Sequence, residues 1–140
     1  MRKLTCIGLL IFTTGCGLRT APVSGRVTLD NKPLVNAMVI FFPDSDDKNP
    51  GPGSQGKTNE NGEYSLKLNA GNANGAMIGK HKVSITGYEG DDGSIASSGP
   101  DMAFRKLIVP AEYNSESKLT FEVPSGGSTS ANFDLKSAPK

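Results

Sequence analysis

The strongest constraint on the fold is a two-residue alternation of apolar and polar side chains that recurs along the chain. In "VSGRVTL" (23–29), Val23, Gly25, Val27 and Leu29 fall on one face and the intervening residues on the other. A strand with one face in a core and the other in water has this period. Four later segments repeat the pattern: 64–68, 82–86, 119–123 and 131–135. Each of them predicts a half-buried strand.

Two further segments complete the predicted set of strands. Residues 37–42 are apolar on both faces, which is typical of a strand covered on both sides or lying at a barrel-like corner. Residues 107–109 form a candidate seventh strand. With 17 glycines and 9 prolines, no regular helix is expected after residue 20. We therefore expect an all-β domain, a seven-stranded Greek-key β-sandwich.

Two long segments between the predicted strands are polar and rich in glycine and proline. They are residues 44–57 and 87–104, and both are expected to be loops. A shorter loop of small residues is expected at 69–76. Loops as long as the first two in a compact domain are usually functional or disordered, and the sequence leaves both open.

The N-terminus has the pattern of a cleaved signal peptide, expected over residues 1–15. Arg2 and Lys3 are followed by a mostly apolar run at 4–12 and by small residues at 13–15. A membrane-spanning helix needs about 20 apolar residues, so this run is too short to span. Cleavage would also remove Cys6 and leave Cys16 as the only cysteine of the mature chain.

The segment Thr13-Thr14-Gly15-Cys16 resembles a bacterial lipobox. The resemblance implies that Cys16 becomes the lipidated N-terminus, with palmitate among its acyl chains, and anchors the protein in a membrane. The alternative is an ordinary secretory signal cut nearby, which would leave a free thiol. Gly17 follows in place of the aspartate that retains lipoproteins in the inner membrane, which favours the outer membrane. Residues 16–22 would then be a lipidated tether, and 23–137 the folded domain.

Three segments in order resemble a carboxypeptidase regulatory-like domain: "VSGRVTLDNKPLVNAMVIFFP", "GKTNENGEYSL" and "GKHKVSI". The tail "VPAEYNSESKLTFEVPSGGSTSANFDL" is similar to the end of many predicted bacterial lipoproteins. The resemblance implies a transthyretin-like β-sandwich in the cell envelope, and most such lipoproteins have no assigned activity. Gly25 is expected where a neighbouring backbone comes close, and Gly62 in a hairpin over 58–62 that needs a positive φ.

Several classes of function are disfavoured by the residues. The chain has 15 basic and 14 acidic residues, so no nucleic-acid partner is expected. His81, the single histidine, shares the parity of the inward residues Val83 and Ile85 and is expected to be a packed ring. Because no nucleophile motif accompanies it, we expect no catalytic residues, no enzyme activity and no cofactor. The match of 51–56 to G-x-G-x-x-G is interpreted as accidental, since a hairpin follows it.

Two other kinds of site have only weak support. Asp44, Asp46 and Asp47, with the acidic pair at 91–92, could gather around a cation, but a solvated acidic loop is the favoured interpretation. Asn132 is predicted to face outward, because its neighbours Ala131 and Phe133 face inward. That orientation disfavours an isopeptide crosslink through its side chain.

Three aromatic residues lie in or beside the expected loops, namely Tyr88, Phe104 and Tyr113. Exposed aromatic rings commonly bind sugars, whereas the alternative for these three is packing at the rim of the sandwich.

We expect a lipid-anchored cell-envelope protein with a structural or protein-interaction role. The alternative is a carbohydrate- or cell-wall-binding module that uses loops 44–57 and 87–104, and a small hydrolase on the same scaffold is a third, weaker hypothesis. The partner would be an envelope protein or a glycan.

Overall fold

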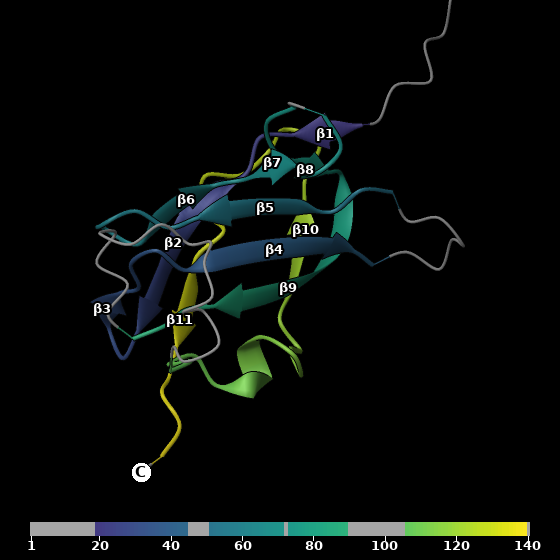
Figure 1. Cartoon of the computed structure of the whole chain (residues 1–140). Coiled ribbons are helices and arrows are strands. Elements are labelled where there is room, and N and C mark those ends of the chain that lie inside the picture. The colour runs from purple at the N-terminus through teal and green to yellow at the C-terminus, as the bar shows by residue number, and fades with distance from the viewer. Residues whose placement is uncertain (1–18, 45–50, 72, 90–105, 140) are drawn as a thin grey trace, which may run out of the picture.

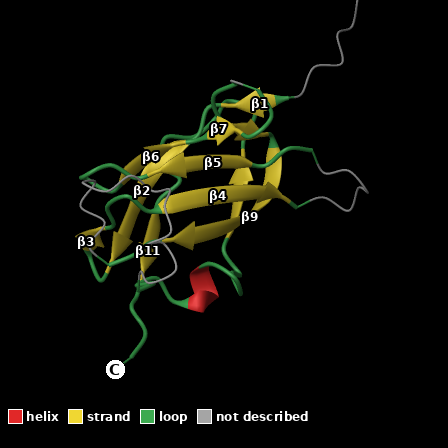
Figure 2. Cartoon of the chain, viewed as in Figure 1, coloured by secondary structure: helices red, strands yellow, loops and turns green. Residues whose placement is uncertain are grey.

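The computed structural model describes residues 19–44, 51–71, 73–89 and 106–139, which form β-sheets and one short helical turn (Figures 1 and 2). The larger sheet has five antiparallel strands in the order β10 (Thr120–Val123), β9 (Gly79–Thr86), β4 (Met38–Pro43), β5 (Ser54–Lys57) and β7 (Lys67–Leu68). The second sheet is built on β2 (Ser24–Leu29), which pairs with β11 (Phe133–Leu135), β3 (Lys32–Pro33) and β6 (Glu63–Ser65). A separate pair joins β1 (Thr20–Ala21) to β8 (Ala76–Met77), and the 3₁₀ turn η2 covers Ala111–Tyr113.

The two sheets share one hydrophobic core, to which both contribute alternate residues. The larger sheet buries Val39 and Phe41 from β4, and the second sheet buries Val27 from β2. The ring of Phe41 lies 5.7 Å from that of Phe121 on β10 and 6.2 Å from that of Phe133 on β11. Because these rings come from both sheets, the contact joins the sheets face to face. The described chain is therefore all-β, with two facing sheets.

Most of the predicted strands are confirmed, with one correction to their burial. Segments 23–29, 64–68, 82–86, 119–123 and 131–135 all contribute strands, and their apolar residues face the core. Residues 37–42 contribute β4, but its burial on both sides is a wrong expectation. Phe41 is fully buried, whereas the side chain of Phe42 is 48% exposed on the outer face.

The expected loop at 44–57 is wrong at its C-terminal end, where residues 54–57 form β5. The residues that β5 buries are Ser54 and Gly56, so its inward face carries no apolar pattern. The strand is defined instead by its neighbours β4 and β7, which pair with it on both sides. The candidate strand at 107–109 is also not formed, since Leu107 makes only an isolated bridge with Tyr88.

Two short strands occupy segments that were expected to be irregular. β1 lies within the expected tether 16–22, and β8 uses the last residue of the expected loop 69–76. The two strands approach so closely that a Cβ on Gly75 would overlap the carbonyl oxygen of Ala21. The described fold thus begins at Thr20, three residues before the expected domain boundary. Strands of two residues are too short to show any periodicity.

The hairpin predicted at 58–62 is confirmed, and its second arm passes from one sheet to the other. The Asn59 side-chain oxygen accepts hydrogen bonds from the backbone N–H groups of Asn61 and Glu63, both at 2.9 Å. Gly62 has the expected positive φ of 75°. β6 then pairs with β2, and after the buried residue Leu66 the chain continues as β7 beside β5. One arm of the hairpin therefore connects the two sheets covalently.

The expected close approach at Gly25 is also confirmed. A Cβ on Gly25 would overlap the carbonyl oxygen of Ala131. The same oxygen accepts a hydrogen bond of 2.7 Å from the phenol of Tyr64, the residue that pairs with Gly25 across β2 and β6. A residue without a side chain is needed at this point, because three segments far apart in sequence meet there.

His81 lies in the core, as its parity predicts, and its side chain is 1% exposed. Its ring centroid is 5.7 Å from that of Phe41, and Nδ1 lies 3.0 Å from the carbonyl oxygen of Gly79. A carbonyl only accepts hydrogen bonds, so Nδ1 carries the proton and Nε2 is a bare acceptor. Nε2 is buried and has no hydrogen-bond partner. Burial lowers the pKa of His81, against the smaller opposing effects of the Gly79 carbonyl and Glu122.

Replacement of Gly25 by alanine tests the close approach of the three segments. The new Cβ would push the Ala131 carbonyl away and break its hydrogen bond with Tyr64. We expect Gly25→Ala to lower the free energy of unfolding by at least about 3 kcal/mol in urea titrations. The control is Gly126→Ala, because a Cβ there would meet nothing within 4 Å. Equal stability of the two variants would contradict the proposed role of Gly25.

The buried state of His81 predicts how stability depends on pH. The unfolded chain takes up a proton near pH 6.5, whereas the folded chain resists protonation to lower pH, so the free energy of unfolding falls as pH drops below about 6.5. The largest slope for one group is about 1.4 kcal/mol per pH unit. His81→Leu should abolish the slope between about pH 5.5 and 6.5, a window in which no other side chain has an unperturbed pKa. Urea titrations across this window measure it, and an unchanged slope in the variant would exclude His81 as its source.

Candidate functional site

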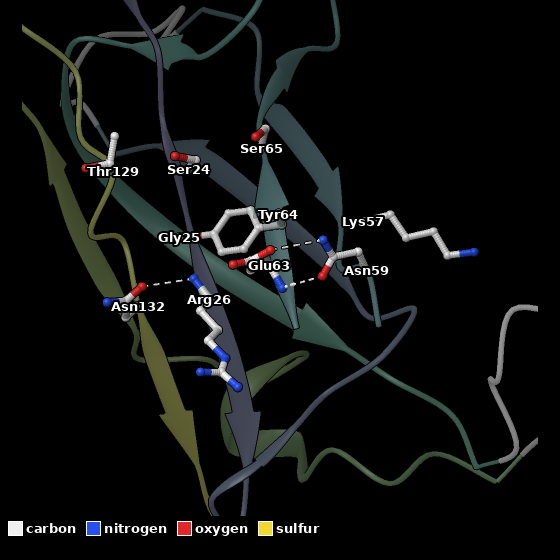
Figure 3. A pocket seen from close by; sticks show the side chains of 10 residues that line it. All are labelled: Ser24, Gly25, Arg26, Lys57, Asn59, Glu63, Tyr64, Ser65, Thr129 and Asn132. Atoms are coloured by element: carbon white, nitrogen blue, oxygen red, sulfur yellow. Dashed lines mark hydrogen bonds between the residues drawn. The ribbon is translucent and has the colours of Figure 1, made fainter. Parts of the chain in front are cut away.

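A polar groove of about 620 Å³ lies over the outer faces of β2 and β6 (Figure 3). Most of the side chains that line it are exposed, and they come from β2, the hairpin and the segment before β11. The lining residues are Ser24, Gly25, Arg26, Lys57, Asn59, Glu63, Tyr64, Ser65, Thr129 and Asn132. We call this the polar groove.

Side-chain hydrogen bonds to the backbone hold the polar groove in shape. The Asn132 side-chain oxygen accepts a 2.9 Å hydrogen bond from the backbone N–H of Arg26, so Asn132 faces outward as predicted. The Nε of Arg26 donates to the carbonyl oxygen of Asn61, also at 2.9 Å. Below the groove, burial raises the pKa of the Tyr64 phenol, which therefore stays protonated and keeps donating to Ala131.

The lining of the polar groove carries charges of both signs. Arg26 and Lys57 are cationic and Glu63 is anionic, and Figure 3 shows the two cationic side chains extending away from each other. The Glu63 carboxylate accepts a hydrogen bond of 3.2 Å from the Asn59 side chain. Several polar groups of the groove are thus already hydrogen-bonded to other groups of the protein. The polar groove is therefore a solvent-exposed surface with charges of both signs and no single charged centre.

A second groove of about 520 Å³ follows the outer side of β9. Its floor is formed by the outward residues of this strand, and its walls come from the ends of β4, the 88–107 bridge and the segment after η2. The lining residues are Phe42, Lys82, Val83, Ser84, Thr86, Tyr88, Leu107, Asn114, Ser115 and Ser117. We call this the β9 groove.

One wall of the β9 groove is fixed by a set of hydrogen bonds. The Asn114 amide donates to the carbonyl oxygens of Val109 and Pro110, at 3.1 and 3.0 Å, and its oxygen accepts from the backbone N–H of Ser115. The buried hydroxyl of Ser117 donates to the carbonyl oxygen of Val83 on β9. The segment after η2 is therefore joined directly to the strand that forms the floor.

The aromatic residues selected from the sequence do not form one cluster. Tyr88 lines the β9 groove. Tyr113 packs against the core, and its phenol oxygen accepts a hydrogen bond of 3.4 Å from the backbone N–H of Lys136, which fits the alternative of rim packing. Phe104 lies outside the described residues, and so does Cys16, the predicted lipidation site.

The weak metal candidate receives no support in the described part of the chain. Asp44 is exposed, and its carboxylate lies 3.7 Å from the ammonium nitrogen of Lys80. Asp46, Asp47 and the pair at 91–92 lie outside the described residues. Among residues 19–44, 51–71, 73–89 and 106–139, no group of three His, Cys, Asp or Glu side chains could hold a metal ion.

Two exposed apolar residues of the β9 groove were missed by the sequence analysis. Phe42 and Leu107 were assigned to strands, the first to one expected to be covered on both sides or to lie at a barrel-like corner. The alternation within "VIFF" does carry a signal, because an inward Phe41 requires an outward Phe42. Nothing in the sequence marks Leu107, which reaches the groove through its bridge with Tyr88.

Within the described residues, no helix is long and apolar enough to cross a membrane. No protein-family model, no curated protein and no solved structure matches this chain. What the protein can bind therefore follows from its own residues and from the geometry of the polar groove and the β9 groove.

Proposed function

We propose that this chain is a lipid-anchored β-sandwich protein of the cell envelope, with a structural or protein-interaction role and no catalysis. The observation that carries the proposal is the short separation in sequence between the lipobox-like motif and the first strand of the fold. The lipobox-like Thr13-Thr14-Gly15-Cys16 is followed by β1 at Thr20, only four residues after the cysteine. Such a short connection would hold the domain close to the membrane.

The connection also sets how the domain would be presented. Four residues reach at most about 14 Å, so β1 would be held at the membrane surface. Figure 1 shows β1 at the end of the molecule opposite to η2 and the C-terminus. The η2 end would then face away from the membrane, toward a partner in the envelope. Placement in the outer membrane is part of this proposal, on the evidence of Gly17.

The finer description of the fold belongs to the same proposal. We propose a seven-stranded Greek-key sandwich of the transthyretin-like, carboxypeptidase regulatory-like type, preceded by a signal peptide over 1–15. Support comes from the principal strands, which number seven when β6 and β7 are taken as one: β2, β4, β5, β6–β7, β9, β10 and β11. The parallel pairing of the first and last of them fits the same arrangement. β5 would then take the place of the strand expected at 107–109.

A second candidate function is carbohydrate or cell-wall binding. It was expected to use loops 44–57 and 87–104, of which Ser54–Lys57 belong to β5. The observation that favours it is the position of Tyr88, which lines the β9 groove from the start of the second of these segments.

Lipidation predicts the mass of the mature protein. In a bacterial host that processes lipoproteins, we expect an intact mass that begins at Cys16 and includes two or three acyl chains. Cys16→Ala should keep residues 1–15 and lose the acyl chains, as measured by mass spectrometry of the membrane fraction. Cys6→Ser is the matched control, because Cys6 would be removed with the signal. An unmodified mature N-terminus would refute the anchor.

The interaction role predicts a partner that depends on the anchor. After crosslinking in cells, the wild type and Cys6→Ser should retain the same envelope partner during purification, and Cys16→Ala should lose it. Quantitative mass spectrometry of the three samples measures this. Equal recovery with Cys16→Ala would show that the association does not need the membrane position.

A further inference from the structure

We infer that the β9 groove is a binding site for a linear, uncharged glycan. This inference rests on the interaction role proposed above and names the class of its partner. It differs from the loop-based carbohydrate hypothesis, because Tyr88 is the only one of its described residues that belongs to either loop. The relevant residues are Phe42, Ser84, Thr86, Tyr88, Leu107 and Ser115.

The first argument is the apolar surface exposed in the groove. The described residues include three large hydrophobic residues that are exposed by more than a third, and two of them line this groove, Phe42 at 48% and Leu107 at 42%. Exposed apolar side chains that gather in a concave site are typical of ligand binding. The C–H faces of sugar rings pack well against such side chains and against the ring of Tyr88.

The second argument is the chemistry of the polar groups between these apolar residues. Ser84, Thr86 and Ser115 carry hydroxyls that line the groove and have no hydrogen-bond partner among the described residues. A hydroxyl both donates and accepts, as each hydroxyl of a sugar does. Among the described residues of the lining, Lys82 is the only charged one and the other polar side chains are neutral, so most of the polar contacts that the groove offers suit an uncharged chain.

The backbone of β9 favours a glycan over an extended peptide. A peptide that binds along a strand usually adds main-chain hydrogen bonds to a free edge. β4 pairs with β9 from His81 to Thr86 on one side, and on the other side β10 pairs with Gly79–Lys82. Beyond β10, Ser117 bonds to the Val83 carbonyl. Further along this side, Leu119 bonds to the Val83 N–H and Ile108 to the Gly87 carbonyl. Much of the backbone at the groove is therefore already occupied, and the groove offers mainly side chains.

The groove is also long and already formed. From Lys82 to Tyr88 the floor extends over seven residues, and extended chain of that length spans about 20 Å. Asn114 and Ser117 fix the adjoining wall through hydrogen bonds to the backbone. A rigid, elongated site loses little conformational entropy on binding. These dimensions fit several consecutive sugar units.

The test is calorimetry of the full chain, purified in detergent, with cellohexaose, chitohexaose and xylohexaose as uncharged probes. We expect binding of at least one of them, with Phe42→Ala weakening it about ten-fold, equivalent to about 1.4 kcal/mol. Thr86→Val removes one hydroxyl at nearly constant shape and should weaken it about five-fold. Ile78→Ala is the matched control, since Ile78 is also exposed, at 37%, but lies outside the groove. Thermal melts confirm that each variant is folded.

Three results would overturn the inference: binding of none of the three hexasaccharides, equal weakening by Ile78→Ala, or binding of an extended peptide in their place. The intact mass of the same preparation reports separately on the lipid anchor. A lipidated protein that binds no glycan would refute the glycan site and leave the proposed envelope role standing. An unlipidated protein that binds a glycan would do the reverse.

Discussion

The fold depends on the hydrogen bond between the Tyr64 phenol and the carbonyl oxygen of Ala131, made possible by the bare backbone of Gly25. These residues belong to the first, middle and last parts of the described chain. The bond keeps the segment before β11 beside β2 and orders the hairpin arm that carries Tyr64. Because the carbonyl is buried from water, loss of its donor would leave an unsatisfied acceptor, which costs about 1–3 kcal/mol.

The two grooves differ in how their polar groups are used. In the polar groove, Asn59, Asn132 and Arg26 already bond to neighbouring groups of the fold. A ligand there would have to compete with these internal bonds. In the β9 groove, the hydrogen bonds of Asn114 and Ser117 lie in the wall, and the hydroxyls of the floor are available. The difference explains why the smaller groove is the stronger candidate for a ligand, although the larger one has more charged side chains.

The sequence predicts those parts of the fold in which apolar side chains alternate. Val27, Phe41 and Ile85 are buried as their parity requires, and the inward position of His81 follows from the same rule. β5 could not be predicted, because it buries Ser54 and Gly56, and its place is set by partners distant in sequence. The β9 groove could not be predicted from the sequence for a related reason. Its residues lie between positions 42 and 117, and only the sheet brings them together. Tyr88 was selected as an exposed aromatic, whereas Phe42 was assigned to a covered strand.

The parallel pairing of β2 with β11 has a consequence for the order in which the chain can fold. The hydroxyl of Thr28 donates to the carboxylate of Asp134, a partner 106 residues further along. Contacts between such distant positions form slowly, since the entropy of closing the long intervening loop opposes them. A chain that is released N-terminus first therefore cannot complete the second sheet until Leu135 has also been released. If the protein is exported, its chain would stay unfolded during most of its transport across the membrane. It would fold into a domain only when its last residues have crossed.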